Sequence, residues 1–186
     1  MHEHDGFFFR AALGYAHLNG AGKVGDGTTQ DIDITGGGAN VSFWFGGTPA
    51  SGLVLGGALL GHAFAEPKVE VSGQSQTAEN TTVSVSAIGP FVQYYIDPKS
   101  GFYIQGVLAY VSAKTTYEVG GTKYESEDTT GGGFALGVGY DFWIGEQWSL
   151  GPEVRFLYAK VKYSGNGPDE EDTLSIPTVS LALTLH

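Results

Sequence analysis

The chain has 186 residues, 41% of them hydrophobic and 13% aromatic, which fits one domain and is too apolar for an intrinsically disordered chain. It has a formal net charge of −11 and no cysteine, which excludes a disulfide framework and cysteine-based metal sites and argues against a nucleic-acid partner. Only 16% of the residues are charged, whereas 30 are glycine, so we expect a charge-poor surface and glycine-rich extended segments.

The beginning of the chain resembles neither a membrane helix nor a signal peptide. No stretch approaches the ~18 consecutive apolar residues of a membrane helix. The first residues, MHEHDG, lack the basic and apolar regions of a signal peptide. We interpret them as a mature N-terminus to which an initiator methionine has been added.

Turn residues divide the chain into extended segments without a sustained helical period. The eight predicted strands cover residues 5–18, 32–46, 52–65, 82–96, 102–117, 131–143, 149–162 and 173–185. Short connections (GGTPAS, DPKSG and IGEQW) alternate with long ones, and we expect a β-bulge within DIDITGGGAN. The alternation predicts an all-β, antiparallel, up-and-down barrel of eight strands that forms a single domain over residues 1–186.

The two faces of these segments differ in size. In GGGFALGVGYDFW, residues 131–143, Phe134, Leu136 and Val138 alternate with alanine, glycine and one aspartate. A soluble strand would pair its apolar face with a polar one, whereas this second face is too small and bare to meet water. We therefore predict that the large face points outward into lipid and the small face lines a narrow lumen.

Aromatic residues bound the outward face at both ends. Near the short connections they are Phe7, Phe9, Tyr94, Phe102, Phe142 and Trp148, and toward the long connections they are Tyr15, Tyr110 and Tyr158. At ~3.3 Å per residue and a tilt of about 40°, they enclose a band roughly 20–25 Å tall. This predicts the apolar belt and aromatic girdles of a membrane barrel. A soluble lipocalin-like barrel is the alternative, but its outer surface would consist largely of glycine and alanine.

With these features the whole chain resembles the small eight-stranded outer-membrane proteins typified by OmpX and the barrel domain of OmpA. The segment FALGVGYDF is similar to the closing strands of that family, whereas the end VSLALTLH lacks the aromatic last residue common in it. The resemblance implies an integral protein of the bacterial outer membrane, with both termini at the periplasmic end.

The net charge of −11 belongs to the four long connections and their flanks, which predicts an acidic rim at one end of the barrel. A solvated surface is the simpler interpretation. Divalent cations are the alternative, because clustered carboxylates suit Ca²⁺ or Mg²⁺. The weak candidate ligands are Asp169, Glu170, Glu171 and Asp172. We expect no other metal and no cofactor.

Two further groups of side chains are candidates for function. Outward lysines just beyond the upper tyrosines are expected to contact lipid headgroups, including lipopolysaccharide phosphates: Lys114, Lys160 and Lys162. Inward polar residues are expected to form a lumen network near the short-turn end: Arg10, Gln93, Gln105, Asp141, Glu153 and Arg155. We expect Asp141 to fall close to Glu153 in the ladder, with an arginine between the two carboxylates.

The sequence gives little support for catalysis, because His17 and His62 lack the partners of a hydrolytic triad. We expect a monomeric, non-enzymatic barrel whose surface loops meet the outside world. The alternative is a narrow channel for small, including apolar, solutes that resembles the OmpW type. A soluble ligand-binding barrel is a third hypothesis.

Overall fold

The computed structural model describes residues 6–24, 30–97, 100–126, 128–163 and 171–186. Twelve strands are present in this part of the chain, and eight of them are long. The long strands are β1 (Gly6–Val24), β2 (Gln30–Ala50), β3 (Leu53–Ala65), β6 (Thr81–Tyr95), β7 (Phe102–Val119), β9 (Thr129–Tyr140), β11 (Trp148–Tyr163) and β12 (Glu171–Leu185). The predicted antiparallel fold of eight strands is confirmed.

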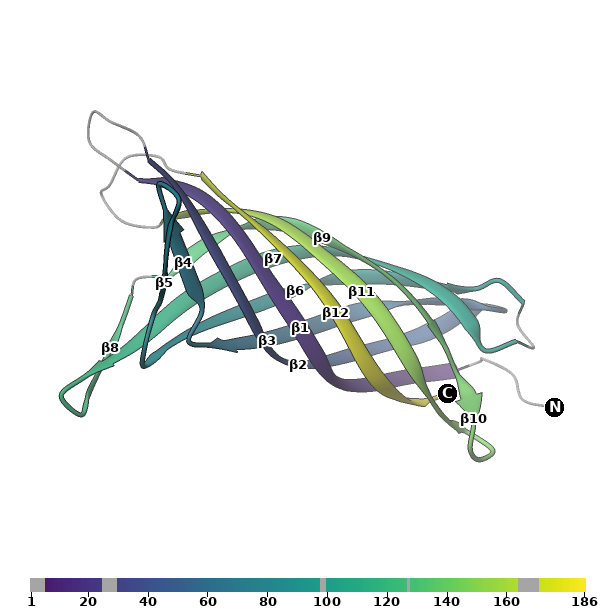
Figure 1. Ribbon diagram of the computed structural model, residues 1–186. Coiled ribbons are helices and arrows are strands. Elements are labelled where there is room, and N and C mark those ends of the chain that lie inside the picture. The colour runs from purple at the N-terminus through teal and green to yellow at the C-terminus, as the bar shows by residue number, and fades with distance from the viewer. Residues whose placement is uncertain (1–5, 25–29, 98–99, 127, 164–170) are drawn as a thin grey trace.

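The long strands form a closed ring, because β1 pairs with both β2 and β12 (Figure 1). One circuit of register partners leaves β1 at Ala21 and passes through Thr173, Lys160, Gly132, Tyr110, Ile88, Leu59 and Phe43 before it returns to β1 at Ala11. This stagger of ten residues tilts the strands across the barrel axis. The start of β1 and the end of β12 lie at the same end, where the short connections also lie.

Three short strands were not expected from the sequence: β4 (Lys68–Val71), β5 (Gln74–Thr77) and β8 (Thr122–Glu125). A fourth, β10 (Phe142–Trp143), is the end of the predicted strand 131–143, which is broken at Asp141. The β4–β5 hairpin turns at Ser72 and Gly73, whose φ angles of 51° and 81° suit a two-residue hairpin turn. It pairs with β2, while β8 extends β7, so both widen the long-loop end of the barrel.

The prediction of a β-bulge within residues 31–40 is wrong. The β1–β2 ladder runs from Gly6 paired with Thr48 to Val24 paired with Gln30 without a shift in register. The irregularity in β2 lies instead between Gly47 and Ala50, where its pairing with β3 shifts before the short turn. The glycines that suggested a bulge continue the strand.

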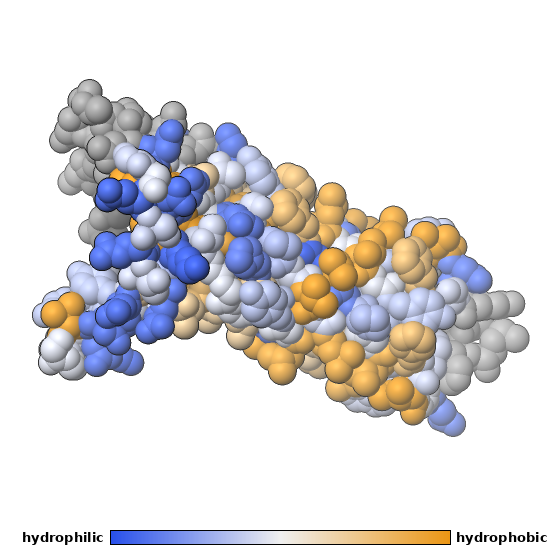
Figure 2. All heavy atoms as spheres, in the orientation of Figure 1, coloured by the Kyte–Doolittle hydropathy of each residue, from blue (hydrophilic) through white to orange (hydrophobic). Residues whose placement is uncertain are grey.

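The large apolar face points outward, as predicted. Leu13, Leu108 and Leu136 are 66%, 69% and 59% exposed. On the face that Figure 2 shows, apolar residues gather on the half of the barrel nearer the short turns. Polar residues cover the long-loop end. The girdle positions Phe7, Tyr15, Tyr94, Phe102, Tyr110 and Phe142 are exposed, and Phe9 and Tyr158 are partly so.

The opposite face of each strand fills the interior. Residues buried there include Phe8, Trp44, Leu60, Phe91 and Leu157, each at most 4% exposed. Alanines between them, such as Ala12 and Ala182, let larger side chains from opposite walls interdigitate. No helix in the described ranges has the length and apolar character of a membrane span.

Candidate functional site

Arg10 lies at the centre of the polar lumen and is fully buried. It stands on the inward face of β1, where alternation with outward Phe9 and Ala11 directs it across the ring. Its Nη2 donates to Asp141 Oδ2 at 2.6 Å, its Nη1 to Gln93 Oε1 at 2.6 Å, and its Nε to Thr184 Oγ1 at 2.8 Å. One guanidinium thus links three other strands or turns to β1.

Arg155, on β11, organises a second cluster. It is 1% exposed on β11, and its Nη1 donates to Glu153 Oε1 at 2.6 Å. Its Nη2 donates to Ser42 Oγ at 2.9 Å and to Asn40 Oδ1 at 3.3 Å, both on β2. The guanidinium carbon lies 5.0 Å from the centre of the Trp44 ring, which adds a cation–π contact. This cluster connects β11 to β2 across the lumen.

The carboxylate of Glu153 joins the two clusters. Arg10 Nη1 lies 3.8 Å from Glu153 Oε2, and the Tyr103 hydroxyl donates to the same oxygen at 3.2 Å. The Tyr95 hydroxyl donates to Asp141 Oδ2 at 2.6 Å. Two arginines and two carboxylates therefore form a balanced set, which is how a protein interior tolerates charge.

The structure brings together five of the six lumen residues proposed from the sequence: Arg10, Gln93, Asp141, Glu153 and Arg155. The sixth, Gln105, is 5% exposed in the lumen, but its amide nitrogen and oxygen form no hydrogen bond with any described residue. The prediction that Gln105 belongs to the network is therefore wrong, because inward parity puts a side chain in the lumen without giving it a hydrogen-bond partner.

Seven further residues of the site were missed: Asn40, Ser42, Trp44, Tyr95, Tyr103, Ser180 and Thr184. All have inward parity on their strands, which was the available signal. The two tyrosines were hard to select because aromatic residues also mark the girdles. Tyr103 fits inside because it lies against Gly139, where a Cβ would collide with its ring.

The expected closeness of Asp141 and Glu153 in the ladder needs correction. Glu153 pairs with Gly139, so Asp141 lies two positions further along, in the break between β9 and β10. Both carboxylates still face inward on neighbouring strands. An arginine does stand between them, and it is Arg10, which comes from a distant part of the chain.

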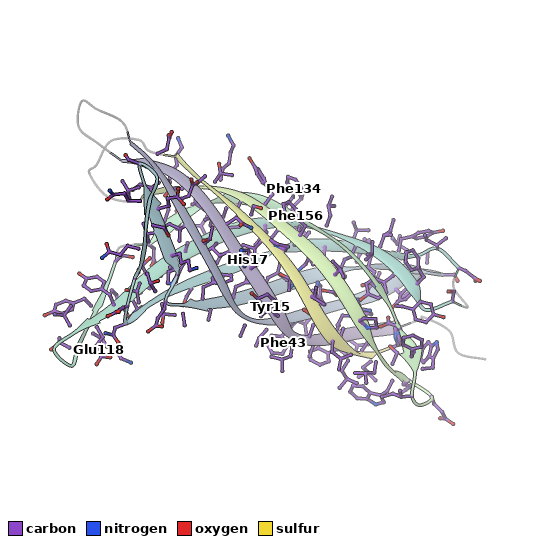
Figure 3. The ribbon with its side chains drawn as sticks, in the orientation of Figure 1. Tyr15, His17, Phe43, Glu118, Phe134 and Phe156 are labelled. Carbon is purple, nitrogen blue, oxygen red and sulfur yellow. The ribbon has the colours of Figure 1, made fainter. Side chains whose placement is uncertain are left out.

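Beyond this network, toward the long loops, the lumen becomes apolar. Its walls there include Leu18, Phe64, Val85, Val111, Leu157 and Ile176, all 1% exposed or less. His62 lies among them and stacks on Phe64 with 6.2 Å between ring centroids. His17 lies on the outward parity of β1, two residues beyond Tyr15, so the wall separates it from His62 (Figure 3).

The three proposed headgroup lysines lie on the outward parity of β7 and β11, beyond the upper tyrosines. Lys160 and Lys162 are exposed on β11. Lys114 is partly exposed and is already paired, with Nζ 2.7 Å from Glu125 Oε2 and 3.8 Å from Asp128 Oδ1. The hydrogen bond and the positive charge of Lys114 lower the pKa of the Glu125 carboxyl.

The acidic rim offers no metal cluster that the structure can place. Asp169 and Glu170 lie outside the described residues, and so does the side chain of Glu171, although its backbone begins β12. Asp172 faces inward, where a Cβ on Gly22 would meet its carboxylate. Among the described residues, no three aspartate, glutamate or histidine side chains are arranged to hold a metal ion.

Several solved structures have the same architecture. Neisserial surface protein A is 16% identical, with a TM-score of 0.55 over 95% of this chain and 96% of its own. OprG, an outer-membrane protein from Pseudomonas aeruginosa, is 14% identical, with a TM-score of 0.56 over 99% and 98%. AlkL, an outer-membrane protein solved in lipid bilayers, is 14% identical, with a TM-score of 0.52 over 100% and 92%.

Sequence comparison adds a family model. The model of the autotransporter β-domain matches residues 7–166. No curated protein sequence matches the chain. The expected likeness to small eight-stranded outer-membrane barrels is confirmed, and the chain is an integral β-barrel of the bacterial outer membrane.

Proposed function

This chain belongs to the autotransporter β-domain family, and we propose that within it the chain acts as a closed barrel whose extracellular surface does the work. The observation that carries the proposal is the charge network across the lumen. Arg10, Asp141, Glu153 and Arg155 are each at most 1% exposed and are linked by contacts between 2.6 and 3.8 Å. A path for ions or for a polypeptide would have to break these ion pairs, and each unpaired charge would be costly.

The proposed working surface is the widened long-loop end. There β4, β5 and β8 add polar hairpins above the membrane band, and Glu118 lies near the tip of the hairpin that β8 forms with β7 (Figure 3). Together with the net charge of −11, this favours cations or basic surfaces as partners and disfavours nucleic acid. The chain is a monomer in this proposal, because two copies with the same acidic rim repel one another.

We also propose lipid headgroups as partners of the outward lysines. Lys160 and Lys162 follow Tyr158 on the outward face of β11, where the apolar belt ends. A lysine in this position reaches the phosphates of the headgroup layer. Lys114, the third proposed lysine, pairs with Glu125 and Asp128. Lipopolysaccharide supplies such phosphates in the outer leaflet.

The proposed role is non-enzymatic. His62 is buried in the apolar part of the lumen, and His17 lies on the other side of the wall. The carboxylates of the lumen are committed to arginine and tyrosine partners, so they are unavailable as general bases.

Conductance in planar bilayers tests the proposal. The wild-type barrel should give no resolved single-channel steps, and neither should Lys123→Ala, which removes an exposed rim charge on β8. The double variant Asp141→Asn/Glu153→Gln should conduct, because it removes the negatively charged partners of both arginines. Well-resolved steps from the wild-type protein would contradict the closed-barrel proposal.

A second candidate function, a narrow path for small apolar solutes, is favoured by one observation. The extracellular mouth holds a cavity of about 150 Å³ whose walls are apolar except for one carboxylate: Gly20, Ala21, Gly22, Ile32, Ile34, Leu174 and Asp172. The apolar upper lumen lies directly below it. Binding of an apolar fluorescent probe that Ile34→Asp abolishes would support this function, whereas equal binding by both proteins would count against it.

A further inference from the structure

The upper aromatic girdle is interrupted on one side of the barrel. Tyr15 on β1, Tyr110 on β7 and Tyr158 on β11 mark the girdle. The strands between β1 and β7 are β2, β3 and β6. Near the level of these tyrosines, their register-paired outward residues are Val41 on β2, Gly61 on β3 and Ser86 on β6. None of these three residues is aromatic, so the girdle is interrupted on three neighbouring strands.

A groove of about 510 Å³ occupies this gap on the outer wall. Its floor is formed by small residues of adjacent strands: Gly61, Ser86 and Ser112, which are register partners. Its sides are large outward side chains that include Val41, Phe43, Leu59, Ile88 and Tyr110. Phe43, one of these walls, is labelled in Figure 3.

The chemistry of the groove changes along its length. The walls nearer the middle of the belt, Leu59 and Ile88, are apolar and 45% and 55% exposed. The end nearer the long loops contains the hydroxyls of Ser86 and Ser112, and Lys114 follows two residues later on the same outward face of β7. The Ser86 hydroxyl makes a long contact of 3.5 Å to the Ser112 carbonyl.

We propose that this groove binds one acyl chain of an outer-leaflet lipid. Hydrocarbon is the medium at this face, because the apolar belt of an outer-membrane barrel lies in lipid. The chain would lie against Leu59 and Ile88, and an ester or headgroup oxygen of the lipid would accept hydrogen bonds from the Ser86 and Ser112 hydroxyls. An amphipathic lipid therefore matches the groove in both polarity and direction. The proposal does not depend on whether the lumen conducts.

Native mass spectrometry of barrels released from dimyristoylphosphatidylcholine vesicles tests the groove. Ser86→Leu and, independently, Ser112→Leu fill its floor with a branched side chain. Ser84→Leu is the matched control, because Ser84 has the same outward parity on β6 but does not line the groove. Retained native mobility on unheated gels establishes that each variant is folded.

We expect both groove variants to retain one lipid fewer per barrel than the wild type and Ser84→Leu. Equal lipid counts in all four proteins would overturn the proposal, and so would an equal loss in Ser84→Leu. A dimer that Ser86→Leu abolishes would also overturn it, because a second copy of the chain would then be the occupant.

Discussion

Replacing Arg155 with alanine removes the centre of one half of the lumen network. Glu153 would lose its 2.6 Å partner, and Ser42 and Asn40 would lose the donor that connects β2 to β11. Among the described residues, Glu153 would keep the Tyr103 hydroxyl at 3.2 Å and the more distant Arg10 at 3.8 Å. Its carboxylate would stay in the interior, because its strand neighbours fix its inward direction.

Leaving one member of a buried ion pair without its partner costs about 3–5 kcal/mol. We therefore expect Arg155→Ala to lower the free energy of unfolding by that amount. At an m-value of about 2–3 kcal/mol/M, the urea midpoint would fall by roughly 1–2.5 M. Lys123→Ala, in the exposed strand β8, should change stability by less than about 0.5 kcal/mol.

Urea unfolding in lipid vesicles, followed by tryptophan fluorescence, measures both variants. Adding Glu153→Gln to Arg155→Ala should recover part of the loss, because the neutral amide removes the unpaired charge. Equal midpoints for Arg155→Ala and Lys123→Ala would refute the reasoning. The lumen charges would then be individually hydrated, and a conducting lumen would become the better proposal.

Three further predictions concern the belt, the lumen wall and the rim. Leu136→Arg puts a cation on a lipid-facing position that is 59% exposed and should cost about 2–4 kcal/mol in the same unfolding assay; a neutral result would contradict the lipid-facing assignment. Gly139→Ala should destabilise by about 1–3 kcal/mol, because its Cβ collides with the Tyr103 ring; an unchanged midpoint would show that the ring can move away. Lys114→Ala should raise the pKa of Glu125 toward its ordinary value in a carboxyl NMR titration, since Lys114 lowers that pKa. The pair therefore stabilises the fold above the ordinary pKa of Glu125, and this stabilisation is lost as the pH falls through the lowered pKa. An unchanged pKa in Lys114→Ala would exclude the pair in solution.

The membrane-spanning part of the fold was predictable because one physical constraint acts on every strand. Lipid requires an outward apolar face, so Leu136, Val138 and their counterparts alternate with small residues throughout the belt. The same alternation assigned Arg10, Asp141, Glu153 and Arg155 to the lumen before any contact was known. Their charge balance then predicted a common network.

The features outside the belt were not predictable in the same way. The strands β4, β5 and β8 are four residues long and meet water on their faces, so no alternation marks them. Register decided other details. Arg10 reaches both Asp141 and Glu153 although it is far from them in sequence. Gln105 has the same inward parity, but its side-chain amide makes no hydrogen bond to a described residue. Parity determines the face of a residue, but the stagger of the ring determines its neighbours.

Thiol accessibility tests the closed lumen most directly, because the chain has no cysteine of its own. Ser180 is 5% exposed beside Asn40 in the lumen network, whereas Ser75 is exposed on β5 outside the membrane. In vesicles, a small charged thiol reagent should label Ser75→Cys readily but label Ser180→Cys only after unfolding in urea. Labelling of the two folded variants at equal rates would contradict the account, because water and ions would then reach the centre of the barrel.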